Sequence, residues 1–199
     1  PFFAGDPELP QAEIMKKLGD FLRSRVDTAL EDRGLAYDMR DAALEARILM
    51  GGVPRPGWCD ATDALARARA LEAFRGDPRF APLVVLFKRV SNILKAATDP
   101  LPPALDTARL AESHEQALLA ATELARVRTA ALWDKRDYAA ILPELLGMGD
   151  AIHGFFDHVM VNVDDVLVRQ NRLRLLADVR ELFLRGWDLS KAVVEGDKG

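Results

Sequence analysis

Residues that form disulfides and bind metals are scarce in this sequence. Cys59 is the one cysteine among 199 residues, so an internal disulfide and a cysteine-based metal site are both excluded. Three histidines (His114, His153 and His158) argue against a histidine-rich site. We therefore predict a chain without a metal site.

Long apolar runs and phosphate-binding loops are missing too. No stretch approaches the roughly 20 apolar residues that a transmembrane helix needs, and no basic segment followed by an apolar run opens the chain. We expect a soluble, cytoplasmic protein with no membrane partner. Because no glycine-rich phosphate loop is present, we also predict no catalytic residues and no cofactor site in this chain.

Basic residues do not dominate the charge. The chain has 27 Lys and Arg against 31 Asp and Glu, a formal net charge of −4. That balance argues against a uniformly basic nucleic-acid binder, although binding needs only a local basic stripe. The first residue is Pro1 rather than Met, so we expect a piece of a longer protein.

Helix-forming residues are abundant. Ala, Leu, Arg and Glu dominate and β-branched runs are few, which is typical of helices. With 49% hydrophobic residues a sizeable core can form. The sequence predicts an all-α bundle of about eight helices, divided into a helical region over 1–78 and a second domain over 79–199. The expected helices cover 11–33, 38–50, 60–75, 82–98, 106–133 and 137–146, with two more between 148 and the end, and a loop at 51–58.

A basic stripe is expected on the helix over 82–98. At helical spacing its apolar residues share one face, while the opposite face holds Lys88, Ser91, Asn92 and Lys95, with Arg89 at its margin. One interpretation is an ordinary solvated face. The other is a nucleic-acid contact, because lysines suit phosphates and an amide suits base edges.

The run "FFDHVMVNVDDVLVRQNRLRLL" (155–176) contains several polar residues of interest. His153 and Asp157 lie one turn apart, but no nucleophile accompanies them, so we assign them no catalytic role. Asp164 and Asp165 can bind Mg²⁺ or cap the last helix, and the spacing favours capping.

The last helix places Arg172 in the middle of its apolar face. A buried guanidinium needs an acidic or carbonyl partner, so we predict a structural ion pair there. Arg169 and Asn171 lie on the flanks of that face, where a ligand can reach them, and Arg174 falls on the exposed face.

The same run resembles the C-terminal end of the β subunit of bacterial heterotetrameric glycyl-tRNA synthetases. That family's pattern is FFD, one residue, VMV, a short acidic connection, then R, one residue and NRL. "FKRVSNILK" (87–95) resembles the start of the family's anticodon-binding domain, and "LGDFLRSRVDTALEDRGLAYDMRDAALEA" (18–46) resembles the helical stretch upstream. The chain departs from the pattern at Trp187, where a small residue is usual, and in the polar tail after Lys191.

The resemblance implies a DALR-type helical bundle that binds the anticodon arm of glycine tRNA. It also implies that the parent ligase uses ATP and Mg²⁺ to join glycine to tRNA, with the adenylation chemistry in a separate α subunit. Candidate tRNA contacts are Lys88, Arg89, Asn92, Lys95, Arg169 and Asn171. Two alternatives are the related domain of an arginyl-type or other tRNA synthetase and a helical protein–protein module.

Overall fold

The computed structural model of the chain describes residues 10–98 and 100–194. Within them lie eight α-helices, one hairpin and three short 3₁₀ helices, so the expected all-α bundle of about eight helices is confirmed. The helices are α1 (Gln11–Glu31), α2 (Tyr37–Leu44), α3 (Ala61–Ala73), α4 (Phe80–Ala96), α5 (Ser113–Asp134), α6 (Tyr138–Leu146), α7 (Gly149–His158) and α8 (Val166–Leu184). The strands are β1 (Arg47–Met50) and β2 (Val53–Pro56), and the 3₁₀ helices are η1 (Gly57–Cys59), η2 (Thr107–Arg109) and η3 (Leu189–Lys191).

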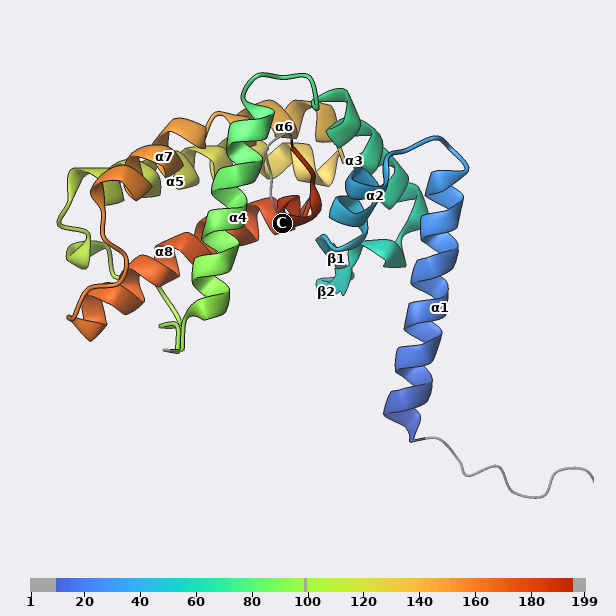
Figure 1. Cartoon of the computed structure of the whole chain (residues 1–199), viewed down its shortest axis with the longest axis horizontal. Helices are drawn as coiled ribbons and strands as arrows, with labels where there is room; N and C mark the ends of the chain where they lie inside the picture. The colour runs from blue at the N-terminus through green and yellow to red at the C-terminus, as the bar shows by residue number, and fades with distance from the viewer. Residues whose placement is uncertain (1–9, 99, 195–199) are drawn as a thin grey trace, which may run out of the picture.

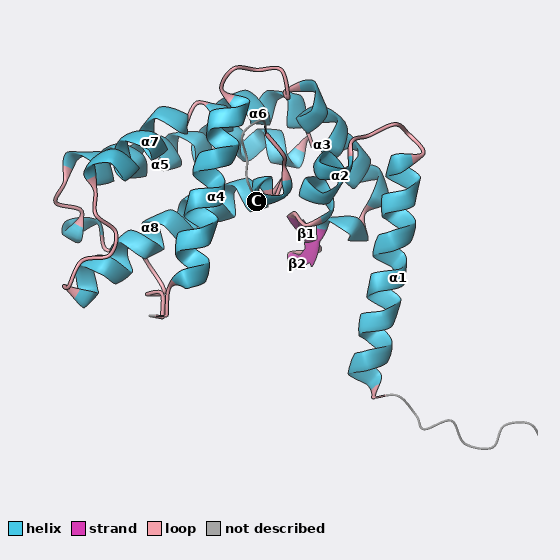
Figure 2. Ribbon diagram, viewed as in Figure 1, coloured by secondary structure: helices cyan, strands magenta, loops and turns pink. Residues whose placement is uncertain are grey.

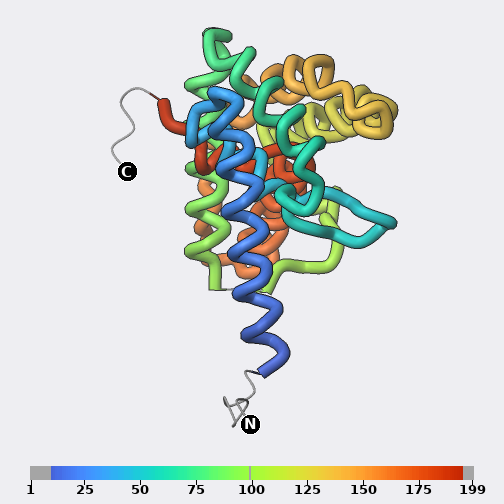
Figure 3. The backbone as a smooth tube through the Cα atoms, turned by 90° about the vertical axis from the view of Figure 1, so that its right-hand side faces the viewer, coloured from blue at the N-terminus to red at the C-terminus, as the bar shows by residue number. Residues whose placement is uncertain are grey.

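The helices pack around one hydrophobic core. Helix α5 contacts α6 and α7, while α4 crosses in front of α8 and also touches α7 (Figure 1). Helices α2 and α3 pack against each other beside the small antiparallel hairpin (Figure 2). Helix α1 contacts α2 and projects past the rest of the molecule (Figure 3). In the described part of the chain, the side of α4 that carries Val85, Arg89 and Asn92 remains exposed.

Local sequence signals fix many of the helix ends. Asp60, Asp137 and Asp165 each accept a hydrogen bond from a backbone N–H in the first turn of α3, α6 and α8, as capping residues do. Gly34 has φ +77°, a conformation that glycine adopts without strain, just after α1. These ends agree with the sequence prediction.

Two expected helices are wrong. The second one ends at Leu44 instead of near residue 50, because Gly51 and Gly52 both have positive φ and turn the chain back, pairing Met50 with Val53 in a hairpin. The predicted 106–133 helix begins only at Ser113, after the short η2.

The chain before residue 79 and the chain after it share contacts in the core. The Trp187 indole is fully buried, and its Nε1 donates to the backbone oxygen of Arg67 at 2.9 Å. Asp38 accepts from the backbone N–H of Val193 at 2.8 Å and pairs with Arg75. The predicted domain boundary at residue 78 therefore stays a prediction. The two regions on either side of it pack closely against each other. Residues 195–199 of the expected polar tail lie outside the described residues.

Gly57 offers a sharp test of this packing. A Cβ there would overlap the backbone oxygen of Ala43 and approach the Arg67 guanidinium, which bonds both Ala43 and Gly57. We expect Gly57→Ala to lower the free energy of unfolding by about 1–3 kcal/mol or more, through overpacking. Gly76→Ala is the matched control, since nothing lies within 4 Å of its Cβ position. Urea unfolding of both variants decides, and equal midpoints would contradict the packing.

Candidate functional site

Helix α4 presents opposite faces to the core and to the outside. Its buried side includes Leu83, Val84, Phe87 and Val90, and the ring of Phe87 packs edge-on against Phe183 of α8 at 5.5 Å. Ser91, which helical spacing placed on the outer face, is instead buried. The packing on α8 and α7 thus fixes which side of α4 faces outward.

The outer face of α4 carries the predicted basic stripe. Arg89, Asn92 and Lys95 are exposed, and Lys88 is half-buried. Burial lowers the pKa of the Lys88 ammonium, while the nearby Asp38 carboxylate acts in the opposite direction. No Asp or Glu occurs anywhere in α4. The structure therefore groups these four predicted residues on one side of one helix.

Arg89 also reaches a neighbouring helix. Its guanidinium carbon lies 4.2 Å from the centroid of the Phe156 ring in α7, a cation–π contact. A cleft of about 440 Å³ opens beside this pair, between α4 and the segment that joins α7 to α8. Its apolar wall includes Ile93, Val159 and Val161. Sequence reasoning missed this cleft, because it forms between residues almost 70 positions apart.

The polar rim of the cleft comes from the end of α7. Asp157 lines the cleft, and its Oδ2 lies 2.8 Å from Nδ1 of His153. His158 also lines it, and its ring stacks in parallel on His114 with centroids 3.9 Å apart. His153 and Asp157 are therefore neighbours, as the sequence predicts, and both side chains are exposed at the rim of the cleft.

Two predicted RNA contacts in α8 differ from each other. Arg169 is half-buried and donates to the backbone oxygen of Val163. Asn171 is only 3% exposed, and its amide bonds both the N–H and the C=O of Asp106 at 2.9 Å. The expectation that a ligand can reach Asn171 is therefore wrong. Its amide holds the segment before α5, so Asn171 is not part of the proposed surface.

Arg172 lies inside the bundle with three partners. Its Nε donates to Glu115 at 2.6 Å and its Nη1 to the backbone oxygen of Met160 at 2.7 Å, while Nη2 pairs with Glu112. Glu115 is fully buried. Arg174, placed on the exposed face by spacing, is half-buried and pairs with Asp178.

The described part of the chain offers neither a cluster of metal ligands nor a membrane-spanning helix. Among residues 10–98 and 100–194, no group of three His, Cys, Asp or Glu side chains is arranged to hold a metal ion. Asp165 is used as the cap of α8. No helix in the described ranges is long and apolar enough to cross a membrane.

Comparison with known proteins bears directly on this surface. The model of the DALR anticodon binding domain matches residues 85–191, which is more than half of the chain and includes α4 from residue 85 onward, the cleft and α8. The chain belongs to the DALR anticodon binding domain family. The basic outer face of α4 therefore lies within a domain type that is described as binding anticodons.

Curated relatives extend the likeness beyond the DALR domain. The chain is 33% identical over 186 residues to the glycine–tRNA ligase beta subunit of Syntrophus aciditrophicus and 35% over 190 residues to that of Desulforudis audaxviator. It is 37% identical over 179 residues to the one from Pseudomonas aeruginosa. These matches cover 90–95% of this chain but only 25–26% of each relative. The chain thus spans about a quarter of the length of the relatives it matches.

The Arg172 ion pairs should contribute strongly to stability. We expect Arg172→Ala to cost roughly 3–5 kcal/mol of unfolding free energy, because it leaves the buried Glu115 carboxylate without its cation. Arg126→Ala, which breaks an exposed pair with Glu123, should cost about 0–1 kcal/mol. Thermal and urea unfolding measure both. Similar losses in the two variants would show that the buried pair contributes no more than a surface pair.

Proposed function

We propose that this chain binds the anticodon arm of glycine tRNA through the outer face of α4. The proposal joins the anticodon-binding family, the glycine–tRNA ligase relatives and the local chemistry. The observation that carries it is the grouping of Lys88, Arg89, Asn92 and Lys95 on a helix face without acids. In this arrangement the lysines contact phosphates, and Asn92 contacts an unstacked base edge.

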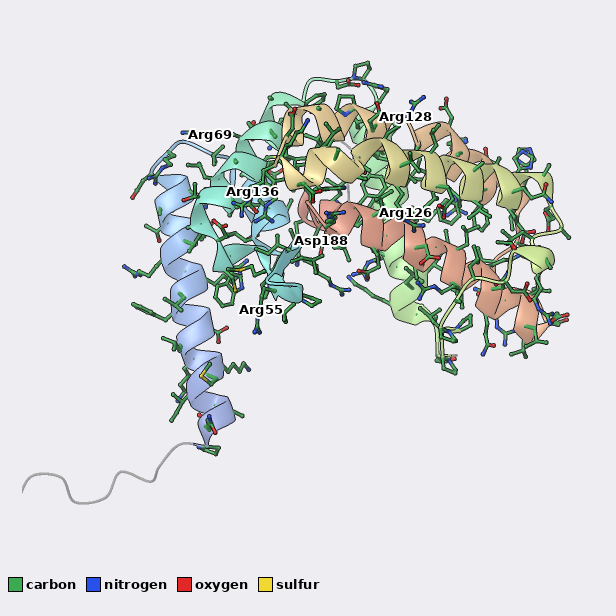
Figure 4. The ribbon with its side chains drawn as sticks, turned by 180° about the vertical axis from the view of Figure 1, so that it is seen from behind. Arg55, Arg69, Arg126, Arg128, Arg136 and Asp188 are labelled. Carbon is green, nitrogen blue, oxygen red and sulfur yellow. The ribbon has the colours of Figure 1, made fainter. Side chains whose placement is uncertain are left out.

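The arginines on the side of the molecule away from α4 support the choice of the α4 face. Figure 4 shows the molecule from behind, and Arg126, Arg128 and Arg136 are among the residues labelled there. These side chains pair with Glu123, Glu144 and Asp60 respectively. The charge of these three arginines is therefore partly offset by their partners. No Asp or Glu occurs within α4, although Asp38 of α2 lies near Lys88. Arg169 extends the proposed surface only if RNA releases it from its backbone bond.

Binding titrations with variants test the surface. Lys95→Ala should weaken binding to any tRNA and reduce the slope of log affinity against log salt by about 0.7–0.9, because one phosphate contact is lost. Asn92→Ala should narrow the preference for glycine tRNA over arginine tRNA and leave the salt slope unchanged. Lys88→Ala should resemble Lys95→Ala but can also disturb packing, since Lys88 is half-buried.

Arg126→Ala is the control for these titrations, since it removes a cation from the other side of the molecule. It should leave affinity, selectivity and salt slope unchanged. Lys95→Ala, Asn92→Ala and Arg126→Ala should keep the parent melting temperature within a few degrees. If Lys95→Ala and Asn92→Ala bind glycine tRNA like the parent, the α4 face is only a solvated surface. Equal binding of the parent to both tRNAs would favour another synthetase.

We further propose that the chain is the C-terminal part of a glycine–tRNA ligase β subunit in the cytoplasm. In the whole enzyme, ATP, Mg²⁺ and an α subunit would carry out glycine activation, and this part would hold the tRNA. The chain's own residues offer no phosphate loop in support of adenylation.

That division of labour gives a separate prediction. The purified 199-residue chain should show no glycine-dependent exchange of pyrophosphate into ATP, because it supplies tRNA contacts and no adenylation site. Holoenzyme of a relative serves as the positive control. Exchange by the chain alone, above a heat-denatured sample, would contradict the assignment.

A further inference from the structure

The cleft beside Arg89 combines an apolar wall with charged side chains, whereas the α4 stripe is basic and polar. Its volume of about 440 Å³ lies within the range of roughly 300–1,000 Å³ typical of small-molecule sites. One side is apolar, formed by Ile93, Val159 and Val161. The rim carries the Arg89 cation, the Asp157 carboxylate and the His158 imidazole. A ligand has to match both surfaces.

These charges limit what the cleft can accept. A phosphate is attracted by Arg89 but repelled by Asp157, and an alkylammonium group is attracted by Asp157 but repelled by Arg89, so the cleft favours neither charge. A neutral, planar ring with hydrogen-bonding edges satisfies both, because its faces pack on apolar or guanidinium surfaces and its edge reaches the rim. Nucleobases have this combination.

Arg89 is held in a position suited to stacking. One side of its guanidinium covers the Phe156 ring at 4.2 Å, yet Arg89 remains exposed and lines the cleft. Guanidinium planes and aromatic rings are the surfaces on which proteins stack splayed-out RNA bases. The buried Phe156 thus orients Arg89 as a platform.

Asp157 can accept a hydrogen bond from the edge of a base. His153 contacts its Oδ2, so Oδ1 remains to accept a hydrogen bond. A carboxylate accepts from the exocyclic amino group of cytosine, adenine or guanine. It repels the carbonyl oxygen that uracil presents at the position of the cytosine amino group.

We propose that this cleft receives one unstacked, amino-bearing nucleobase of the bound RNA, with Arg89 as the stacking platform and Asp157 as the base-selecting residue. The inference rests on the proposed binding of the anticodon arm and adds a place for one of its bases. The α4 lysines hold the backbone and Asn92 contacts one base edge, while the cleft discriminates at a second base.

The experiment uses the 199-residue chain and an anticodon stem–loop of glycine tRNA. Each amino-bearing anticodon base is replaced in turn by an abasic site, and cytosine is also replaced by uracil. For one position, the abasic change should weaken binding to the parent chain about tenfold, within the range for loss of one base–aromatic stack. At that position Arg89→Lys should bind intact RNA about tenfold more weakly and show no further loss with the abasic RNA. Arg89→Lys keeps the positive charge, so its salt slope should match that of the parent.

Asp157→Asn tests the edge contact. The parent should bind the cytosine RNA more tightly than the uracil RNA at the same position, and Asp157→Asn should lose that preference. His153→Asn is the matched control, because it removes the partner of Asp157 but keeps the carboxylate, and it should retain the preference.

The outcomes separate the two proposals. If no abasic RNA binds more weakly, or if Arg89→Lys responds to the abasic site as the parent does, no base enters the cleft. In that case a Lys95→Ala defect would still support RNA binding by α4. A parent chain that binds no tRNA at all overturns the proposed function, and this is visible in the first titration before any variant is used.

Discussion

The buried ion pairs of Arg172 are the constraint on which the site depends. One guanidinium in α8 bonds Glu115 and Glu112 at the start of α5 and the backbone oxygen of Met160 in the connection between α7 and α8. A charge removed from water requires partners with good geometry, so its position determines theirs. Met160 lines the cleft. The same contact therefore stabilises the bundle and fixes one wall of the proposed base site.

The outer face of α4 is set by the packing of its inner face. Phe87 lies against Phe183, and Val84 and Val90 are fully buried, so rotation of the helix about its axis would expose large apolar area. The polar residues on the other side are consequently held in a fixed row. Arg89 gains a second restraint from Phe156. A surface that is rigid before binding loses less entropy when a ligand is bound.

Local signals and distant contacts differ in how well the sequence predicts them. The Asp60, Asp137 and Asp165 caps follow from short-range chemistry and were predictable. The placement of Arg172 on an apolar face also follows from local spacing. Its acidic partners lie almost 60 residues away, near the start of α5, and the sequence predicts that start incorrectly. The hydrogen bonds between the Asn171 amide and the Asp106 backbone join residues 65 positions apart, and the helical spacing of apolar residues does not predict them. The Arg89–Phe156 contact and the cleft arise in the same way, from tertiary packing alone.

A chain of net charge −4 can still carry a local basic face, because many acids in its described part have local partners. Asp60, Asp137 and Asp165 hold backbone N–H groups, while Glu112, Glu115, Glu123 and Glu144 pair with arginines of α5 and α8. Each ion pair reduces its own field within a few ångströms, and the helix N-termini compensate part of the charge of the capping carboxylates. Beyond about 8–10 Å, salt screens what remains. No Asp or Glu occurs within α4 itself, and Asp38 of α2 is an acid that acts on Lys88. The proposed phosphate contacts of this face therefore depend on its local charge more than on the overall charge of the chain.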